Sequence, residues 1–557
     1  MLAVCLSVSV PGPATAETAA PLPGGTTRAT AVPTLGPDAD ATVFVFTPTP
    51  TPSPTTDTPT TGVPGPGSPA PETQPTPTAS PTKDAVLEAD PPAWQEDHGN
   101  PASWGIALVV LAASLVLVVV LARRPDQYST QPTPGAPAAS RAEASDDGRA
   151  RASAGVAALS AVGEAMLDAG YSVTGVRATM EDIAAVNGVP ATEIVVFPTA
   201  LFVSSRESGD VRTGAVSSGH TPLHLNQIDA LDDVIREART RPCAPDAITG
   251  RVRAMRALPP PYSPAQRVAA YVLLSGSLAV LLGGSWAGVA VAAALGGFAG
   301  FVLLKTERIQ RQYEALVTVG LAFAVSTVVF TLTQIGLDPG VLAALIAPLV
   351  ILLPGGLLTT GVVELATGQM MAGAGRLAAG TMQLVLLAAG VVAGASIVGV
   401  PRLELDQSQN PLGPAGPWIA VALYGVGIVV HQCGRPRSIA WILLVLYVAY
   451  GAQVVGDLFF GGVLSALIGA FAMTPVAYLV SQQRSGPAAF ASFLPAFWLL
   501  VPGSLGLVGV TAILDGDSAG LTTLVTTAST MVAIMLGILA GTAVGSRLAG
   551  RGTVAAI

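Results

Sequence analysis

The chain has 557 residues, of which 51% are hydrophobic and only 11% are charged. A soluble domain carries roughly twice that charged fraction, so the composition excludes a wholly soluble protein and indicates an integral membrane protein with soluble parts. The formal net charge of -8 gives no indication of a nucleic-acid partner. The three cysteines are far apart and form no CxxC pattern, which argues against a disulfide framework or a zinc ribbon. Walker, HExxH and GxSxG motifs are absent, so we expect no cofactor and disfavour direct ATP drive.

The first 152 residues divide into four segments of different composition. Residues 1–16 are apolar and end on a small-residue cleavage site, but they lack a basic start, so a signal peptide is one of two equally supported interpretations. Residues 17–102 are rich in Pro and Thr and predict a disordered extracytoplasmic segment, with a dispensable linker as the simpler alternative. Residues 103–122 predict one transmembrane helix, followed by two arginines that mark its cytoplasmic end. Residues 123–152 form a polar linker.

Residues 153–262 have an ordinary globular composition and predict a small α+β domain. Basic residues flank this domain on both sides, which places it in the cytoplasm by the positive-inside rule. Thr221 and Pro222 are typical of an N-cap and a first helical residue. The acidic residues Asp229, Asp232, Asp233 and Glu237 are interpreted as a solvated helix face. The expected elements are helices at 156–168, 176–186, 223–238 and 245–258, and a β-rich stretch at 193–205 with a partner strand at 211–217.

The remainder of the chain contains ten apolar segments that predict a membrane domain. Lysine and arginine occur in every second gap between these segments, and acidic residues dominate the other gaps. This asymmetry predicts ten spans in the plasma membrane, with the C-terminus in the cytoplasm. The segments are 268–284, 286–304, 315–335, 341–362, 378–400, 417–432, 438–455, 459–480, 488–512 and 521–546.

A Pro-Gly phrase interrupts two of these apolar segments. Leu352–Leu357 reads LLPGGL, and Leu500–Leu505 reads LVPGSL. Each phrase lies in the fourth segment of a group of five, within 266–400 and 417–546. Because an odd number of spans reverses the insertion of the second copy, the sequence predicts a 5+5 inverted-repeat bundle. The fold class is therefore an α-helical polytopic membrane protein with an extra N-terminal transmembrane helix and an α+β cytoplasmic domain.

Two regions carry a resemblance to a known family. The first contains Gly170-Tyr171-Ser172-Val173, Met180, Ile183, the runs 196–204 and 224–231, and Pro259–Tyr262. The second is 352–376, with Glu364, Gly368 and Arg376. In these motifs the chain resembles the threonine/serine exporter family, ten-span secondary exporters with an N-terminal soluble domain, over roughly 155–546. The resemblance implies export of L-threonine and L-serine driven by the proton motive force. Some relatives are linked to dicarboxylate export, so the substrate stays open.

The two Pro-Gly phrases are the predicted substrate site. A zwitterion in a membrane needs donors for its carboxylate and acceptors for its ammonium group, and a broken helix offers both. The alternative is that these small residues only allow close helix packing. The predicted substrate-binding residues are Pro354, Gly355, Gly356, Thr359, Thr360, Pro502, Gly503 and Ser504.

Glu364 and His431 are the predicted proton-coupling residues. A carboxylate inside a membrane is costly and therefore a functional candidate, although a structural pair with Arg376 is the alternative. Histidine in general titrates near neutral pH, which makes His431 a candidate for a proton relay, but a side chain at the inner end of its span that reaches towards water is the simpler interpretation. His220 and His224 are too close to a predicted helix start to form a metal site of the HExxH type, so no metal is expected.

The sequence favours a secondary transporter, not an enzyme, with small amino acids and protons as its partners in the bilayer. Export of dicarboxylates or other small metabolites is the first alternative. A membrane-anchored hydrolase in 153–262 and a sensor that joins the outer segment to a cytoplasmic partner are the others. A homo-oligomer is compatible with the sequence.

Overall fold

The computed structural model describes residues 146–189, 192–207, 210–219, 222–307, 309–337, 339–400, 413–483, 485–500, 503–516 and 519–548, and a few helical residues between 109 and 116. The predicted signal peptide, the Pro/Thr-rich segment, most of the first transmembrane helix and the linker up to residue 145 lie outside this part of the chain. His220 and Pro502 also lie outside it.

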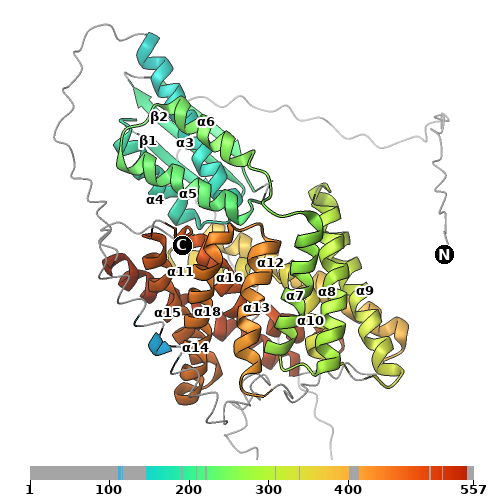
Figure 1. Cartoon of the computed structure of the whole chain (residues 1–557). Coiled ribbons are helices and arrows are strands. Elements are labelled where there is room, and N and C mark those ends of the chain that lie inside the picture. Colours follow the sequence, from blue (N-terminus) through green and yellow to red (C-terminus); the bar gives the residue numbers. More distant parts are fainter. Residues whose placement is uncertain are drawn as a thin grey trace, which may run out of the picture. The chain divides into compact units, whose positions relative to one another are not determined.

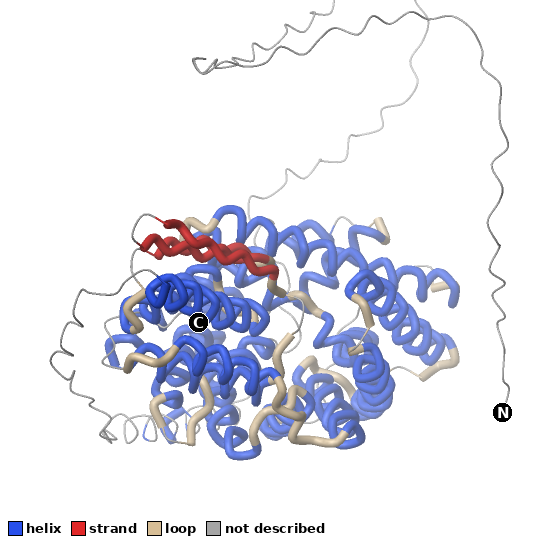
Figure 2. Tube along the Cα trace, turned by 90° about the horizontal axis from the view of Figure 1, so that it is seen from above, coloured by secondary structure: helices blue, strands red, loops and turns tan. Residues whose placement is uncertain are grey.

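An α+β domain precedes the membrane helices and has its own apolar core. Three strands form one antiparallel sheet in the order β1-β2-β3, and Figure 2 shows them side by side. Helix α3 packs against β2 and β3, and its Leu159 and Val162 share one buried core with Leu201 and Val203 of β2. The elements are α3 (Asp146–Ala169), α4 (Val173–Val186), β1 (Thr192–Phe197), β2 (Ala200–Glu207), β3 (Asp210–Ser217), α5 (Leu225–Thr240) and α6 (Pro245–Arg256).

Three details of this domain differ from the sequence prediction. Helix α3 begins at Asp146, inside the predicted linker. The β-rich stretch 193–205 is a hairpin, because Phe197 pairs with Ala200 and leaves Pro198 and Thr199 as a two-residue turn. Proline lacks the N–H that a strand interior requires and has the φ angle of a turn residue. The N-cap of α5 is His224 rather than Thr221, and the side chain of Gln227 accepts the His224 N–H at 2.9 Å.

The membrane part of the chain is helical throughout the described residues. Each of the ten predicted apolar segments contains helix, and the fourth and ninth are each divided in two. Figure 1 shows these helices as one bundle, with α3–α6 grouped beside the strands. The elements are α7 (Pro264–Leu281), α8 (Trp286–Thr306), η2 (Arg311–Tyr313), α9 (Glu314–Gln334), α10 (Val341–Ile346), η3 (Ala347–Leu352), α11 (Gly355–Ala366), α12 (Met370–Val398), α13 (Gly416–His431), η4 (Pro436–Ser438), α14 (Ile439–Phe460), α15 (Gly462–Ser481), α16 (Ala489–Leu500), α17 (Gly503–Leu514) and α18 (Ala519–Leu548).

The length and composition of these helices indicate a polytopic membrane protein. Among the residues that the structure describes, seven helices are long and apolar enough to cross a membrane, or nine if each bent pair is one span. Helix α13 is apolar but shorter. Many of the large apolar side chains on α8, α9 and α18 are exposed, as expected for surfaces that face lipid.

Glycines bring the long helices into close contact at equivalent places in the two halves. A Cβ added at Gly390 of α12 would lie 2.6 Å from the Val319 carbonyl oxygen of α9. A Cβ added at Gly537 of α18 would lie 2.4 Å from the Leu467 carbonyl oxygen of α15. Small residues are typical of membrane helix interfaces, because they let two backbones approach. The pair α9–α12 in the first half therefore matches the pair α15–α18 in the second.

Candidate functional site

Both Pro-Gly phrases break a helix. The helices on either side of the first break, 341–352 and 355–366, are bent by 61°. Across the second break, α16 and α17 are bent by 40°. Pro354 directly precedes α11, where proline removes a backbone donor and glycine removes side-chain cover, so the break follows from the local sequence.

The two breaks lie in contact with each other. A Cβ added at Gly503 would lie 3.3 Å from the Leu353 Cβ and 3.6 Å from the Gly355 Cα and backbone nitrogen. Gly355 and Gly503 are both buried, and each is the first residue of its helix. The N-termini of α11 and α17 therefore meet at one place. Because a helix N-terminus carries a partial positive charge and unpaired N–H groups, this place is suited to an anionic group.

Side chains from neighbouring helices satisfy carbonyl groups beside the breaks. Gln383 on α12 donates from Nε2 to the Leu352 carbonyl at 2.7 Å. The Tyr271 hydroxyl on α7 donates to the Pro348 carbonyl at 2.9 Å, and the Tyr424 hydroxyl on α13 donates to the Pro495 carbonyl at 3.3 Å. Both tyrosines are fully buried. Each comes from the first apolar segment of its half and reaches the proline that precedes the break, so the two halves share this contact.

The sequence prediction did not name these tyrosines. A buried tyrosine needs a partner for its hydroxyl group, and each of the two stands alone in an apolar helix. That residue pattern was the available signal, but it does not reveal the partner. The partner is a main-chain carbonyl far along the chain.

Replacing either tyrosine by phenylalanine is expected to destabilise the protein. Tyr271→Phe and Tyr424→Phe each leave a buried carbonyl without its donor, which costs about 1–3 kcal/mol in the free energy of unfolding. Thermal unfolding in detergent measures the loss. Tyr313→Phe is the matched control, because Tyr313 is 47% exposed at the start of α9. Equal midpoints for all three variants would contradict a supporting role.

Two threonine hydroxyls near the breaks are buried without a hydrogen-bond partner among the described residues. Thr359 on α11 and Thr511 on α17 are 0% and 1% exposed, and neither Oγ1 has a partner. A buried hydroxyl usually has a hydrogen-bond partner, so these two retain unused hydrogen-bonding capacity near the breaks. Thr359 was predicted as a substrate residue, whereas Thr511 was not. Its position two turns after Gly503 gave no distinctive sequence signal.

The other predicted substrate residues lie along the same segments. Pro354 is buried, and Gly356, Thr360 and Ser504 are half-buried. Thr360 and Ser504 belong to the first two turns of α11 and α17. The substrate-binding roles of all these residues remain predictions. The alternative, that the small residues only allow close helix packing, also has a counterpart in the structure.

That counterpart is a pair of glycine contacts after the breaks. A Cβ added at Gly373 of α12 would lie 2.6 Å from the Gly361 carbonyl oxygen of α11. A Cβ added at Gly520 of α18 would lie 2.7 Å from the Gly509 carbonyl oxygen of α17. Gly361 and Gly509 stand at the same distance from their prolines, so the contacts after the two breaks also correspond.

Glu364 lies at the other end of α11 and is fully buried. Its Oε2 lies 3.0 Å from the Arg376 Nε, so the ion pair that the sequence left as an alternative is present. Its Oε1 accepts the Val173 N–H of α4 at 3.0 Å. Arg376 in turn donates to the Tyr171 carbonyl at 3.0 Å. The pair therefore connects α11 and α12 to the loop between α3 and α4 of the α+β domain.

His431 is the last residue of α13 and belongs to a different buried group. Its Nδ1 lies 3.1 Å from the Arg267 carbonyl oxygen, and its carbonyl accepts the Arg267 Nε–H at 3.0 Å. The Arg267 guanidinium forms an ion pair with Glu307. The His431 ring also meets the Tyr271 ring edge-on at 4.7 Å, which links it through Tyr271 to the first break. A proton-coupling role for His431 remains a prediction.

Comparison with known proteins identifies a family for part of the chain. Residues 157–398 match the family model described as "Putative threonine/serine exporter". This region extends from α3 to the end of α12 and includes the first break, Glu364 and Arg376. The match confirms the family resemblance over these residues. Searches of curated proteins and of solved structures give no significant match.

Proposed function

We propose that this chain, whose residues 157–398 match the threonine/serine exporter family, is a secondary transporter that exports threonine and serine from the cytoplasm, driven by the proton motive force. The observation that carries the proposal is the contact between Gly503 and the Leu353–Gly355 segment. It joins two broken helices of opposite halves inside an apolar bundle, which is how secondary transporters build a substrate site near the membrane midplane.

The chemistry of the two breaks suits a zwitterion with a hydroxyl group. The N-termini of α11 and α17 bind the carboxylate, and carbonyl groups freed at the ends of η3 and α16 accept from the ammonium group. Thr359 is buried without a partner and binds the substrate hydroxyl, with Thr360 and Ser504 nearby in sequence. Gln383 already occupies the Leu352 carbonyl, so it fixes the break rather than the substrate.

The two halves act as 5+5 inverted repeats. Three matched contacts support this relation: the tyrosine bonds to Pro348 and Pro495, the glycine contacts after each break, and the pairs α9–α12 and α15–α18. In this arrangement the halves exchange conformations, and the site opens to one side of the plasma membrane at a time. The α+β domain and the C-terminus lie in the cytoplasm, as the distribution of basic residues indicates.

Glu364 carries the coupled proton in this proposal. It is the buried carboxylate of α11, the helix that also begins at the substrate site. Arg376 is its charge partner when the carboxylate is ionised. Protonation of Glu364 would weaken that ion pair and free the end of α11 from α12. His431, which touches the first break through Tyr271, is the second residue of the proton path.

Efflux of labelled amino acid tests the proposal. Cells that express the protein are loaded with threonine- or serine-containing dipeptides, and efflux is followed with and without a protonophore. We expect saturable efflux that requires the protein and collapses when the protonophore is added. Efflux that is the same in cells without the protein would contradict the substrate assignment. Protein-dependent efflux that the protonophore does not reduce would contradict the proton coupling but not the substrate assignment.

A dicarboxylate is the second candidate substrate. Two helix N-termini at one place offer donors to two carboxylates as readily as to one. The same assay with cells loaded with labelled succinate distinguishes the candidates, because an amino acid exporter gives no protein-dependent efflux of succinate.

A further inference from the structure

The α+β domain contacts the first broken pair through the buried Glu364–Arg376 ion pair. Val173 is the first residue of α4, and its N–H donates to Glu364. The Arg376 guanidinium donates to the Tyr171 carbonyl. A carboxylate at a helix N-terminus is favoured by the helix dipole, so α4 stabilises the charged form of Glu364. The domain is thus hydrogen-bonded to the end of α11 and to the first turns of α12.

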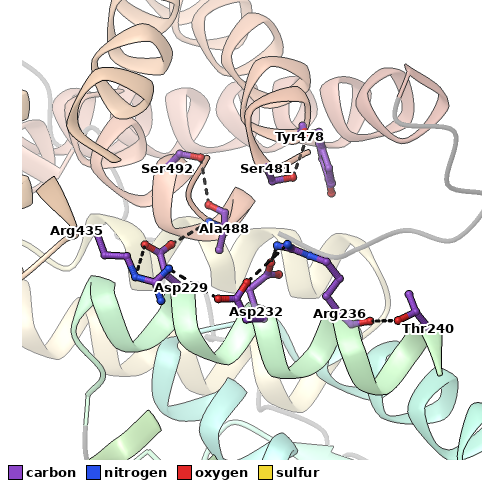
Figure 3. Close-up of polar contacts among 10 residues, drawn as sticks. Asp229, Asp232, Arg236, Thr240, Arg435, Tyr478, Ser481, Ala488 and Ser492 are labelled. Carbon is purple, nitrogen blue, oxygen red and sulfur yellow. Dashed lines mark hydrogen bonds and ion pairs between the residues drawn. The ribbon is translucent and has the colours of Figure 1, made fainter. Parts of the chain in front are cut away.

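The same domain contacts the second broken pair through Asp229. Its Oδ1 accepts the Ala488 N–H at 2.9 Å, directly before α16 begins (Figure 3). Arg435, before η4, lies 3.8 Å from the other carboxylate oxygen. The Asp229 side chain is only 3% exposed. The sequence interpretation of Asp229 as part of a solvated face is therefore wrong, because the membrane helices cover it.

An apolar contact joins these two polar contacts. The buried core of the α+β domain includes Ala372 of α12, Ala488 directly before α16, and Phe490 and Ala491 in the first turn of α16. The Phe490 ring stacks on the Tyr171 ring with their centres 4.3 Å apart. Tyr171 and its neighbours thus touch α12 of the first half and α16 of the second half at once.

We propose that the α+β domain is a latch that holds α11 of the first broken pair, together with the adjoining helix α12, to α16 of the second broken pair, and that it must release α16 before the site opens to the cytoplasm. The proposal rests on the proposed function, because it assigns a gate to the same site. Alternating access requires the two broken pairs to move relative to each other. A domain that binds both at their adjacent ends opposes that movement while it is docked.

Of the two polar contacts, the one at α16 is the weaker, and in this proposal it is the one that opens. Glu364 and Arg376 make two hydrogen bonds to the domain as well as their ion pair, whereas Asp229 makes one hydrogen bond and a longer ion pair. Separating Glu364 from Arg376 would leave two buried charges without partners, so the first contact is costly to open. The segment 257–263 also ties the domain directly to α7 of the first half.

Protonation of Asp229 tunes the latch. Burial raises its pKa to about 6, partly offset by the Ala488 N–H and by Arg435, while the neighbouring carboxylates of Asp232 and Asp233 raise it further. Burial raises the pKa of Tyr171 well above its usual value, and the charges of Asp232 and Asp229 and the nearby Tyr478 raise it further. When the domain is released, Asp229 is solvated and its pKa is near 3.8. Because docking raises this pKa, the protonated form of Asp229 favours docking. Docking is therefore strongest below pH 3.8 and weakens as the pH rises from 3.8 to about 6.

Cysteine labelling in the full-length protein tests the latch. In a background with Cys5, Cys243 and Cys433 replaced by alanine, Ala491→Cys places a thiol under the docked domain, where Ala491 is 1% exposed. We expect a water-soluble maleimide to label this thiol slowly. Adding Asp229→Ala removes the acceptor for the Ala488 N–H and should raise the labelling rate roughly tenfold or more.

Two variants control this experiment. Asp229→Asn keeps an oxygen that accepts the Ala488 N–H, so labelling at neutral pH should stay near that of the parent. Glu181→Ala removes an exposed carboxylate on α4 and should leave labelling unchanged. Labelling that is equally slow in Asp229→Ala, or equally fast in Glu181→Ala, would overturn the latch.

A covalent lock connects the latch to transport. In Asp229→Cys/Ala488→Cys, a disulfide or a short thiol cross-linker holds the domain on α16. We expect the locked protein to stop exporting and to recover on reduction. Undiminished export by the locked protein would overturn the latch and leave the proposed function intact. If the reduced protein exports no amino acid, the proposed function fails, and the labelling result alone decides the latch.

Discussion

Gly503→Leu is expected to abolish export while leaving membrane insertion intact. Leucine at this position would place its Cβ 3.3 Å from the Leu353 Cβ and the rest of its side chain into the Gly355 backbone. The Cβ alone already meets Leu353 closely, so the larger leucine side chain has to push the two helix N-termini apart. Since a displacement of about 1 Å can reduce the rate of a positioned reaction about 100-fold, we expect at least that loss in the rate of efflux.

A glycine elsewhere in the bundle supplies the control. Gly320 lies on α9, and a Cβ added there would meet nothing within 4 Å. Gly320→Leu makes the same chemical change on a surface that faces lipid, so it should export normally. Gly355→Leu should behave like Gly503→Leu, because it acts on the other side of the same contact. Export by both break variants at the rate of Gly320→Leu would contradict the assigned site.

Glu364→Gln is expected to destabilise the protein by about 3–5 kcal/mol, because it leaves the buried charge of Arg376 without a partner. The Glu364 side chain is 0% exposed and the Arg376 side chain is 10% exposed. Chemical unfolding in detergent measures the change in the free energy of unfolding. Glu181→Gln is the control, since its ion pair with Arg177 is about half exposed and contributes at most about 1 kcal/mol.

A double variant separates stability from proton coupling. Glu364→Leu/Arg376→Leu removes both charges, so it should recover much of the stability that the single variant loses. If Glu364 carries the coupled proton, any export by the double variant will continue at the same rate when the protonophore is added. Protonophore-sensitive export by the folded double variant would assign the proton to another group, and His431 would be tested next.

The two Pro-Gly phrases show how far local sequence reaches. Proline and glycine break a helix through their own backbone properties, so the breaks at Pro354 and Gly503 follow from residue type alone. The same is true of the membrane helices, which follow from long apolar runs. That the breaks touch each other is a different matter. It depends on packing between segments separated by well over a hundred residues, which no local pattern encodes.

Glu364 and Asp229 also show the difference between what local sequence predicts and what tertiary packing decides. The sequence placed Glu364 just after the apolar segment 341–362 and offered Arg376 as its partner, and both residues stand close together in the chain. It gave no sign that Val173 donates to Glu364, because that bond joins two domains. Asp229 was assigned to solvent because its helix has a polar face. Whether such a face meets water or another domain depends on what packs over it.

The sequence by itself therefore determined the class of protein, the position of nearly every helix, the two breaks and the family resemblance. These depend on composition, periodicity and backbone chemistry, which act within a few residues. Only the tertiary structure decided that the breaks meet, that Tyr271 and Tyr424 support them, and that the α+β domain covers Glu364 and Asp229. These contacts arise because buried polar groups need partners, and the partner is whichever distant group the fold brings within hydrogen-bond distance.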